Sequence, residues 1–153
     1  ISFYCVYEIR VNLPGLDYRY FMFILLICIS TDLGGYIFGK IFKGPKLTKI
    51  SPKKTFSGVI GGYLLSIIIL SMYLKSTFSP FKQSEFTFKI FIFILVISSI
   101  SQLGDIIISY FKRSSKIKDT GKIIPGHGGL LDRIDGMIFA FPFSYLIFKA
   151  NIF

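Results

Sequence analysis

The sequence predicts an all-α fold, a polytopic membrane helix bundle with about four transmembrane helices. Of its 153 residues, 52% are hydrophobic and 17% are charged, whereas a soluble domain is about 25% charged. The apolar residues occur in blocks, which fit a single membrane domain, residues 1–153, with a few spans. A disordered basic tail is excluded because such tails lack apolar residues. No nucleic-acid partner is expected, because the positively charged residues are not interspersed with the polar residues that form the surface of a soluble domain.

Four apolar blocks are the expected spans: residues 20–41, 56–74, 86–111 and 134–150. A helix needs about 20 residues to cross the hydrocarbon core, and the first three blocks are long enough. The fourth has an apolar run of only 13 residues, 136–148, and contains Pro142. We therefore expect the fourth span to kink, to tilt or to include flanking residues.

The positive charges are concentrated in two of the connections between these blocks. The two connections hold 12 of the 18 basic residues: Lys40, Lys43, Lys46, Lys49, Lys53 and Lys54 in the first, and Lys112, Arg113, Lys116, Lys118, Lys122 and Arg133 in the third. Because two spans separate these connections, both should emerge on the same face of the membrane. The positive-inside rule makes that face cytoplasmic.

The N-terminal residues 1–7 are apolar but run directly into Glu8 and Arg10. They lack the basic start and the small-residue cleavage site of a signal peptide, so we expect them to be the tail of an earlier span. Cys5 and Cys28 are isolated thiols without metal-ligand spacing, and we expect both to act as small hydrophobic residues.

Small residues recur at the spacing that allows two membrane helices to pack closely. Gly35 and Gly39 form one G-x-x-x-G pair, and Gly58 and Gly62 form another. Since glycine has no Cβ, such pairs let the backbones of neighbouring helices approach each other. We expect the first two spans to use these glycines in their contact.

Two carboxylates lie in or near apolar spans, where they are costly. Asp32 follows Ser30 and Thr31 in the first span, and Asp105 lies near the end of the third. A carboxylate at membrane depth costs on the order of 2.5–3.5 kcal/mol on insertion scales, so it usually faces a cavity, a partner or an ion. Both lie near the expected cytoplasmic ends of their helices, and we expect them to converge.

The third connection adds Asp119, Asp132 and Asp135. Side chains three residues apart share one face of a helix, as Asp132 and Asp135 would. Two carboxylates on one face suit Mg²⁺, which takes one or two carboxylates and keeps sites for water and phosphate oxygens. The glycine-rich segment 126–129, with the only histidine at His127, could bring backbone N–H groups close to phosphate.

Residues 109–135 resemble, over 27 residues without a gap, the signature of the phosphatidate cytidylyltransferase family, also called CDP-diacylglycerol synthases. Matching residues outside this string are Ser30, Asp32, Gly35, Tyr36, Gly39 and Lys40, the segment 51–55, Gly58, Gly61 and Gly62, and Gln102, Gly104 and Asp105. The resemblance covers residues 20–148 in the family's order. Two departures remove a charge, since the family often has an acidic residue where Ser57 stands and Glu where Ile108 stands.

The resemblance implies the synthesis of CDP-diacylglycerol and pyrophosphate from CTP and phosphatidic acid, with Mg²⁺ as cofactor and a second cation left open. It implies a multi-pass protein of the bacterial-type inner (plasma) membrane, with the basic loops as catalytic loops facing the cytoplasm. The partners would be CTP, phosphatidic acid and the lipid bilayer, and a homodimer is left open. Family members are usually longer, so the chain is expected to be the C-terminal catalytic part.

The resemblance also implies roles for individual residues. The expected metal ligands are Asp105, Asp119, Asp132 and Asp135, and Lys118 and His127 join them as catalytic residues. The expected substrate-binding residues are Ser30, Asp32, Lys53, Lys54, Thr55, Lys112, Arg113, Gly128, Gly129 and Arg133.

Four alternatives stay open. A polyprenol kinase would share basic loops and spans but should lack the ungapped string from Lys118 to Asp135. A CDP-alcohol phosphatidyltransferase carries a longer aspartate array than the Asp132–Asp135 spacing. A non-catalytic membrane subunit or ion pathway would use Asp32 and Asp105 to line a channel. An inactive or truncated homologue would account for Ser57 and Ile108.

Overall fold

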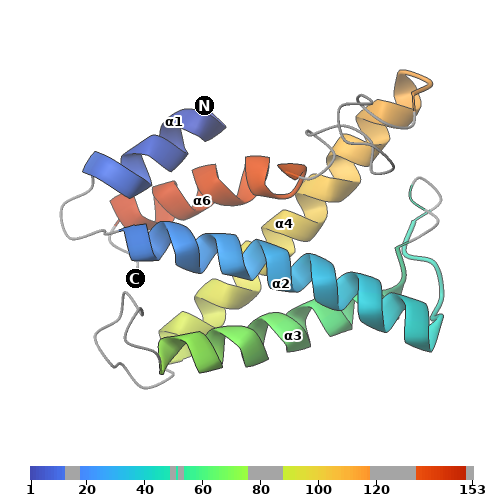
Figure 1. The fold of residues 1–153 in the computed structure, drawn as a ribbon. Helices are drawn as coiled ribbons and strands as arrows, with labels where there is room; N and C mark the ends of the chain where they lie inside the picture. The colour runs from blue at the N-terminus through green and yellow to red at the C-terminus, as the bar shows by residue number, and fades with distance from the viewer. Residues whose placement is uncertain (13–17, 49–50, 52–53, 76–87, 118–133, 151–153) are drawn as a thin grey trace, which may run out of the picture.

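The computed structural model describes residues 1–12, 18–48, 51, 54–75, 88–117 and 134–150. Within these ranges the chain is mainly helical, and the expected all-α fold is confirmed (Figure 1). The elements are α1 (Ser2–Tyr7), the π-helical turn η1 (Glu8–Asn12), α2 (Tyr18–Phe42), α3 (Phe56–Leu74), α4 (Phe88–Ser114) and α6 (Met137–Lys149).

Three of the four expected spans are helices that can cross a membrane. α2, α3 and α4, with 25, 19 and 27 residues, are long and apolar enough to do so, and the chain is a multi-pass membrane protein. α6 corresponds to the fourth block but has only 13 residues, with Pro142 inside it. At 1.5 Å per residue it is about 20 Å long, shorter than the ~30 Å hydrocarbon core.

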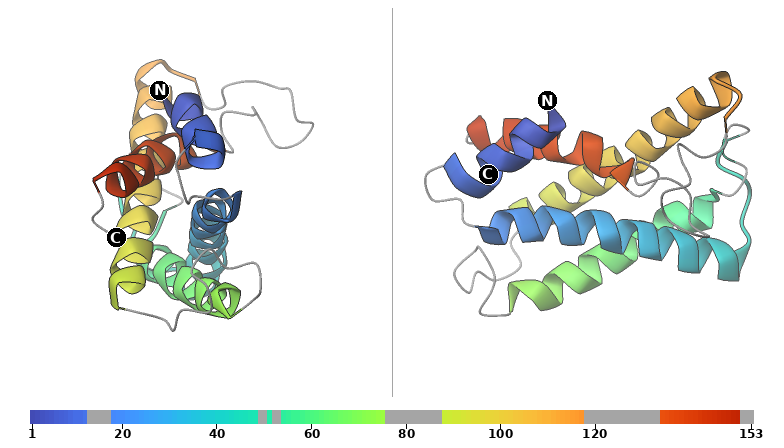
Figure 2. Two further views of the ribbon diagram at one scale, coloured as in Figure 1. Left: turned by 90° about the vertical axis from the view of Figure 1, so that its left-hand side faces the viewer. Right: turned by 45° about the horizontal axis from the view of Figure 1, so that its top comes forward.

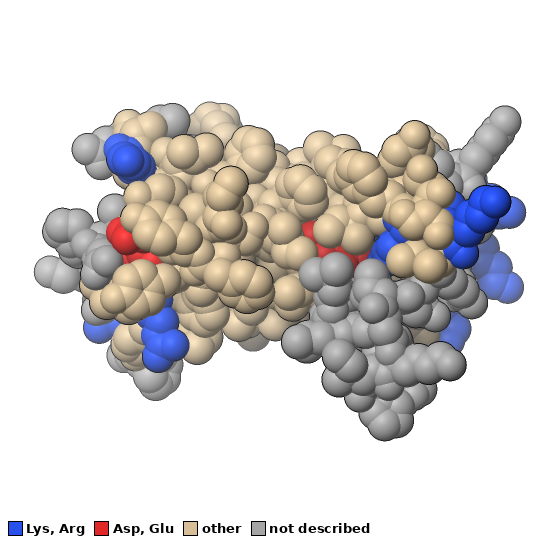
Figure 3. Space-filling view, turned by 90° about the horizontal axis from the view of Figure 1, so that it is seen from above, with Lys and Arg blue, Asp and Glu red and all other residues tan. Residues whose placement is uncertain are grey.

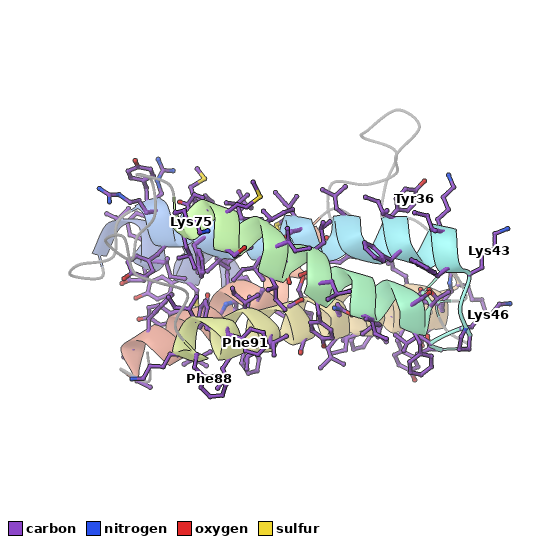
Figure 4. The ribbon with its side chains drawn as sticks, turned by 90° about the horizontal axis from the view of Figure 1, so that it is seen from below. Tyr36, Lys43, Lys46, Lys75, Phe88 and Phe91 are labelled. Carbon is purple, nitrogen blue, oxygen red and sulfur yellow. The ribbon has the colours of Figure 1, made fainter. Side chains whose placement is uncertain are left out.

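The helix ends that carry the basic connections lie together at one end of the bundle. The end of α2, the start of α3 and the end of α4 all lie on that side of the molecule, and we call this the basic end (Figures 1 and 2). Figure 4 shows Lys43 and Lys46 at the basic end and Lys75 at the opposite one. The expectation that both basic connections emerge on one face is therefore consistent with the described residues that flank them.

The helix α3 is turned with its small residues inward and its large apolar residues outward. Ile60, Leu64, Ile68 and Met72 recur every four residues and are 47–70% exposed, which suits a stripe facing lipid tails. The buried residues of α3 include Gly58, Gly61, Gly62 and Ser66. This distribution is typical of membrane helices, because lipid is as apolar as leucine and close packing needs small residues.

Glycines bring α2 and α3 into direct backbone contact, as the spacing predicted. A Cβ on Gly58 would lie 2.7 Å from the carbonyl oxygen of Gly35, and one on Gly34 would lie 2.9 Å from the Cα of Gly62. A Cβ on Gly34 would also collide with the carbonyl oxygen of Gly61. The G-x-x-x-G expectation is confirmed, and Gly34 is the additional contact residue.

We expect Gly34→Ala to destabilise the protein by about 2 kcal/mol, because the added methyl group meets backbone atoms of α3 that cannot move alone. The neighbouring Gly35→Ala is the matched control, since its Cβ would lie 3.7 Å from the nearest atom, an ordinary contact. Thermal unfolding of both variants in detergent measures the difference. Equal melting temperatures would contradict the proposed tight contact at Gly34.

The connection between α2 and α3 folds back on itself and fixes the position of Lys54. Lys46 and Thr55 form an isolated antiparallel bridge, and the Leu47 N–H donates to the Lys54 carbonyl at 2.8 Å. Thr55 then caps α3, because its hydroxyl oxygen accepts from the Gly58 N–H at 3.1 Å. The Lys54 side chain is thereby held at the start of α3.

The opposite end of the bundle is an aromatic and aliphatic core. Phe93 of α4 lies between Phe23 of α2 and Phe148 of α6, with ring centroids 6.1 and 5.4 Å apart. Towards the basic end the packing becomes polar, where the buried hydroxyls of Thr31 and Ser98 bond at 2.7 Å. The interior of the bundle therefore changes from apolar to polar along its length.

Candidate active site

A cavity of about 360 Å³ lies among α2, α3, α4 and the start of α6, on the polar side of the interior. On the face shown in Figure 3, a patch of acidic surface lies between the two ends of the molecule, and Lys and Arg side chains lie at both ends. The residues lining the cavity are Thr31, Asp32, Gly35, Tyr36, Lys54, Gly58, Val59, Gln102, Asp105, Ser109 and Asp135. Three carboxylates and one lysine thus share a single hollow.

Asp105 projects from α4 and is paired with the lysine of the first connection. The Nζ of Lys54 lies 2.9 Å from Oδ2 of Asp105 and 3.4 Å from the carbonyl oxygen of Gln102. The Lys54 and Asp105 side chains are 29% and 21% exposed. The pair is open to the cavity, so a ligand can reach both charges.

Asp135 stands just before α6 and is paired with the last turns of α4. The Nζ of Lys112 lies 2.8 Å from Oδ2 of Asp135, and the two side chains are only 13% and 9% exposed. Gly136 allows this close approach, because a Cβ there would collide with the Ser101 hydroxyl and lie 2.9 Å from Oδ1 of Asp105. The start of α6 is therefore pressed against α4 beside Asp105.

Asp32 reaches the same cavity from α2, so the expected convergence of Asp32 and Asp105 is present in the structure. Within the described ranges, no group of three His, Cys, Asp or Glu residues is close enough to hold one ion. Mg²⁺ needs only one or two carboxylates, and water or phosphate oxygens complete its coordination. Asp105 and Asp135 on one cavity fit such a cation shared with a phosphate ligand.

Three further residues with expected substrate roles are placed by the structure. Ser30 is buried and donates to the carbonyl of Ile27 in its own helix, at 3.1 Å, and it is not part of the cavity lining. Thr55 serves as the cap of α3. Arg113 lies exposed in the last turn of α4, at the basic end.

The remaining expected site residues lie outside the described residues. They are Lys53, Lys118, Asp119, His127, Gly128, Gly129, Asp132 and Arg133. Their assignments as metal ligands, catalytic residues or substrate ligands stay predictions from the sequence.

Tyr36, Gln102 and Ser109 are among the cavity residues that were not assigned a role from the sequence. Tyr36 follows Asp32 by four positions, and Gln102 and Ser109 lie three before and four after Asp105. Side chains at these spacings share a helix face. The periodicity around each aspartate was therefore the signal that could have identified them.

The two positions that depart from the family pattern lie outside the cavity lining. The Ser57 hydroxyl accepts from the Gly44 N–H at 3.3 Å and bonds to the Thr55 hydroxyl at 3.0 Å. It therefore ties the first connection to the start of α3. Ile108 lies on α4 beside Ser109, the residue that does line the cavity.

Comparisons with known proteins find relatives over most of this chain. A model of the cytidylyltransferase family matches residues 3–151. The chain is 43% identical over 134 residues to a phosphatidate cytidylyltransferase of Rickettsia typhi, covering 84% of this chain and 58% of that protein. It is 40% identical over 144 residues to a phosphatidate cytidylyltransferase of Staphylococcus epidermidis, covering 93% of this chain and 52% of the relative. The chain thus spans a little more than half the length of these relatives.

Proposed function

The chain belongs to the cytidylyltransferase family, and from this premise we propose that it transfers CMP from CTP to phosphatidic acid, giving CDP-diacylglycerol and pyrophosphate. The relatives that share about 40% of its sequence carry the name of this activity. Because the chain covers only part of their length, we propose that it supplies the catalytic part of a longer enzyme. The observation that carries the proposal is the cavity shared by Asp32, Lys54, Asp105 and Asp135.

The place of the cavity suits one lipid and one water-soluble substrate. We propose that the basic end faces the cytoplasm, in line with the positive-inside rule. Phosphatidic acid would keep its acyl chains in the bilayer and its phosphate at the level of the cavity. CTP would enter from the aqueous side, past the basic residues of the two connections.

In the reaction, a phosphate oxygen of phosphatidic acid attacks the α-phosphorus of CTP. The new P–O bond forms in line with the bond from the α-phosphorus to the bridging oxygen, which breaks as pyrophosphate leaves with that electron pair. The attacking phosphate monoester is already ionised at pH 7, so no separate general base is needed. The protein's contribution is positioning and neutralisation of charge.

The described residues can supply both the positioning of the substrates and the neutralisation of their charge. Lys54, Lys112 and Arg113 would neutralise phosphate oxygens, which carry most of the negative charge of both substrates. Asp105 and Asp135 would hold Mg²⁺, together with Asp119 and Asp132 from the sequence assignment. The cation would supply charge neutralisation at the transferred phosphoryl group, and a second cation at the same site is part of the proposal.

The proposal is tested with membranes or detergent-purified protein, phosphatidic acid and CTP labelled in either the α- or the γ-phosphate. We expect label from the α-phosphate to enter the lipid extract only when phosphatidic acid and Mg²⁺ are present. The γ-label should leave as pyrophosphate. Transfer of the γ-label to a lipid alcohol would instead indicate a kinase, and no transfer of either label would indicate an inactive homologue.

We expect Ser57→Ala to leave CMP transfer within about threefold of the wild type, because this residue lies outside the cavity lining. It should lower stability by about 1 kcal/mol through loss of the hydrogen bond to Gly44. The initial rate and the melting temperature of the same preparation check both statements. A loss of activity without a loss of stability would indicate that Ser57 takes part in CMP transfer.

A further inference from the structure

Asp105 and Asp135, the two described carboxylates that we propose as cation ligands, are each paired with a lysine ammonium group. Lys54 lies 2.9 Å from Asp105 and Lys112 lies 2.8 Å from Asp135. The two lysines come from different segments, Lys54 from the first connection and Lys112 from the last turns of α4. The first connection and α4 therefore each place a lysine ammonium group on an aspartate carboxylate beside the same cavity.

We propose that Lys54 and Lys112 are exchangeable counter-ions of this site. Without ligand they neutralise Asp105 and Asp135, and when a divalent cation arrives with a nucleotide they turn to the phosphate oxygens while the carboxylates take the cation. The identity of the incoming anion as CTP rests on the proposed function. The exchange itself concerns only the four side chains and a cation.

The charges in and beside the cavity explain why cation and nucleotide should arrive together. Asp32, Asp105 and Asp135 in the cavity carry up to three negative charges, Lys54 in the cavity carries one positive charge, and Lys112, paired with Asp135 beside it, carries another. A divalent cation entering alone would face both ammonium groups at short range. The phosphates of the nucleotide give those groups new partners, so each ligand improves the binding of the other, which is a coupling between two sites.

The geometry also suits an exchange of partners. Lysine has a flexible stem and a compact charge with three donors, so it can move to another acceptor without a change of backbone. Lys112 follows Asp105 by seven residues, two turns of α4, and the two side chains share a face of that helix. A short swing along α4 would therefore carry the Lys112 ammonium group from Asp135 toward a phosphate held near Asp105.

The test measures cation binding without nucleotide, using Mn²⁺ as the probe and the electron paramagnetic resonance signal of free Mn²⁺ as the readout. We expect Lys54→Met and Lys112→Met to bind Mn²⁺ at least about tenfold more tightly than the wild type, because each removes a competing charge. Lys54→Arg keeps the charge and should bind Mn²⁺ as the wild type does. Lys46→Met is the matched control, because Lys46 is an exposed lysine of the same connection outside the cavity lining.

In the presence of Mn²⁺, the same two methionine variants should bind CTP at least about tenfold more weakly than the wild type, as judged by equilibrium dialysis. Opposite signs for cation and nucleotide distinguish an exchange from a fixed structural ion pair. Folded Lys54→Met and Lys112→Met proteins with unchanged or weaker Mn²⁺ affinity would overturn the proposal. If the wild type fails to transfer CMP while the Mn²⁺ result holds, the proposed function fails and the exchange of counter-ions stands.

Discussion

Asp105→Asn is expected to lower CMP transfer by about a thousandfold, the largest loss among the described residues, because it removes a charge at the centre of the site. Asp105 lies 2.9 Å from Lys54 and lines the cavity with Asp32 and Asp135. Asparagine has almost the same shape but carries no charge, so it can neither hold a cation nor pair with an ammonium group in the same way. The effect should therefore fall on the chemistry rather than on the packing of α4.

The measurement is the initial rate of transfer of α-labelled CMP to lipid, per amount of folded protein. Glu8→Gln is the control, since it removes one acidic charge in η1, at the end of the bundle opposite the basic end. We expect this control to retain a rate close to that of the wild type. An Asp105→Asn rate within tenfold of the wild type would remove Asp105 from the set of cation ligands.

The helices of this protein could be predicted well because their limits follow local signals. The block 56–74 coincides with α3, where Thr55 provides the cap and Lys75 ends the apolar run. α4 continues to Ser114, three residues past the expected end at 111. Lys112 and Arg113 end the apolar block, but both are good helix formers. Hydropathy therefore underestimates the length of α4 at this end.

The types of residue that form the site could be predicted from the sequence, but the ion pairs between them could not. Asp32 and Asp105 were expected to converge because carboxylates at membrane depth need a cavity or a partner. Nothing in the sequence assigns Lys54 to Asp105 or Lys112 to Asp135, because each pair depends on how α4 packs against another element. The first pair needs the fold of the first connection, and the second needs the close approach at Gly136.

The pair of Lys112 and Asp135 allows a second large effect to be predicted, on stability. We expect Lys112→Met to destabilise the cation-free protein by about 3 kcal/mol, because it removes the ammonium partner of a carboxylate that is only 9% exposed. Asp135→Asn alone should also destabilise, since it breaks the same pair from the other side. Thermal unfolding in detergent with a chelator present measures both variants.

The double variant Lys112→Met/Asp135→Asn decides whether these losses come from the pair itself. If the cost of each single change is the loss of this ion pair by a buried charge, removing both charges should recover about 2 kcal/mol relative to the sum of the single losses. A cation can take the place of the lysine, so added Mn²⁺ should raise the melting temperature of Lys112→Met more than that of the wild type. Additive losses, or equal stabilisation of both proteins by Mn²⁺, would show that Lys112 supports α4 through its packing and not through the charge of Asp135.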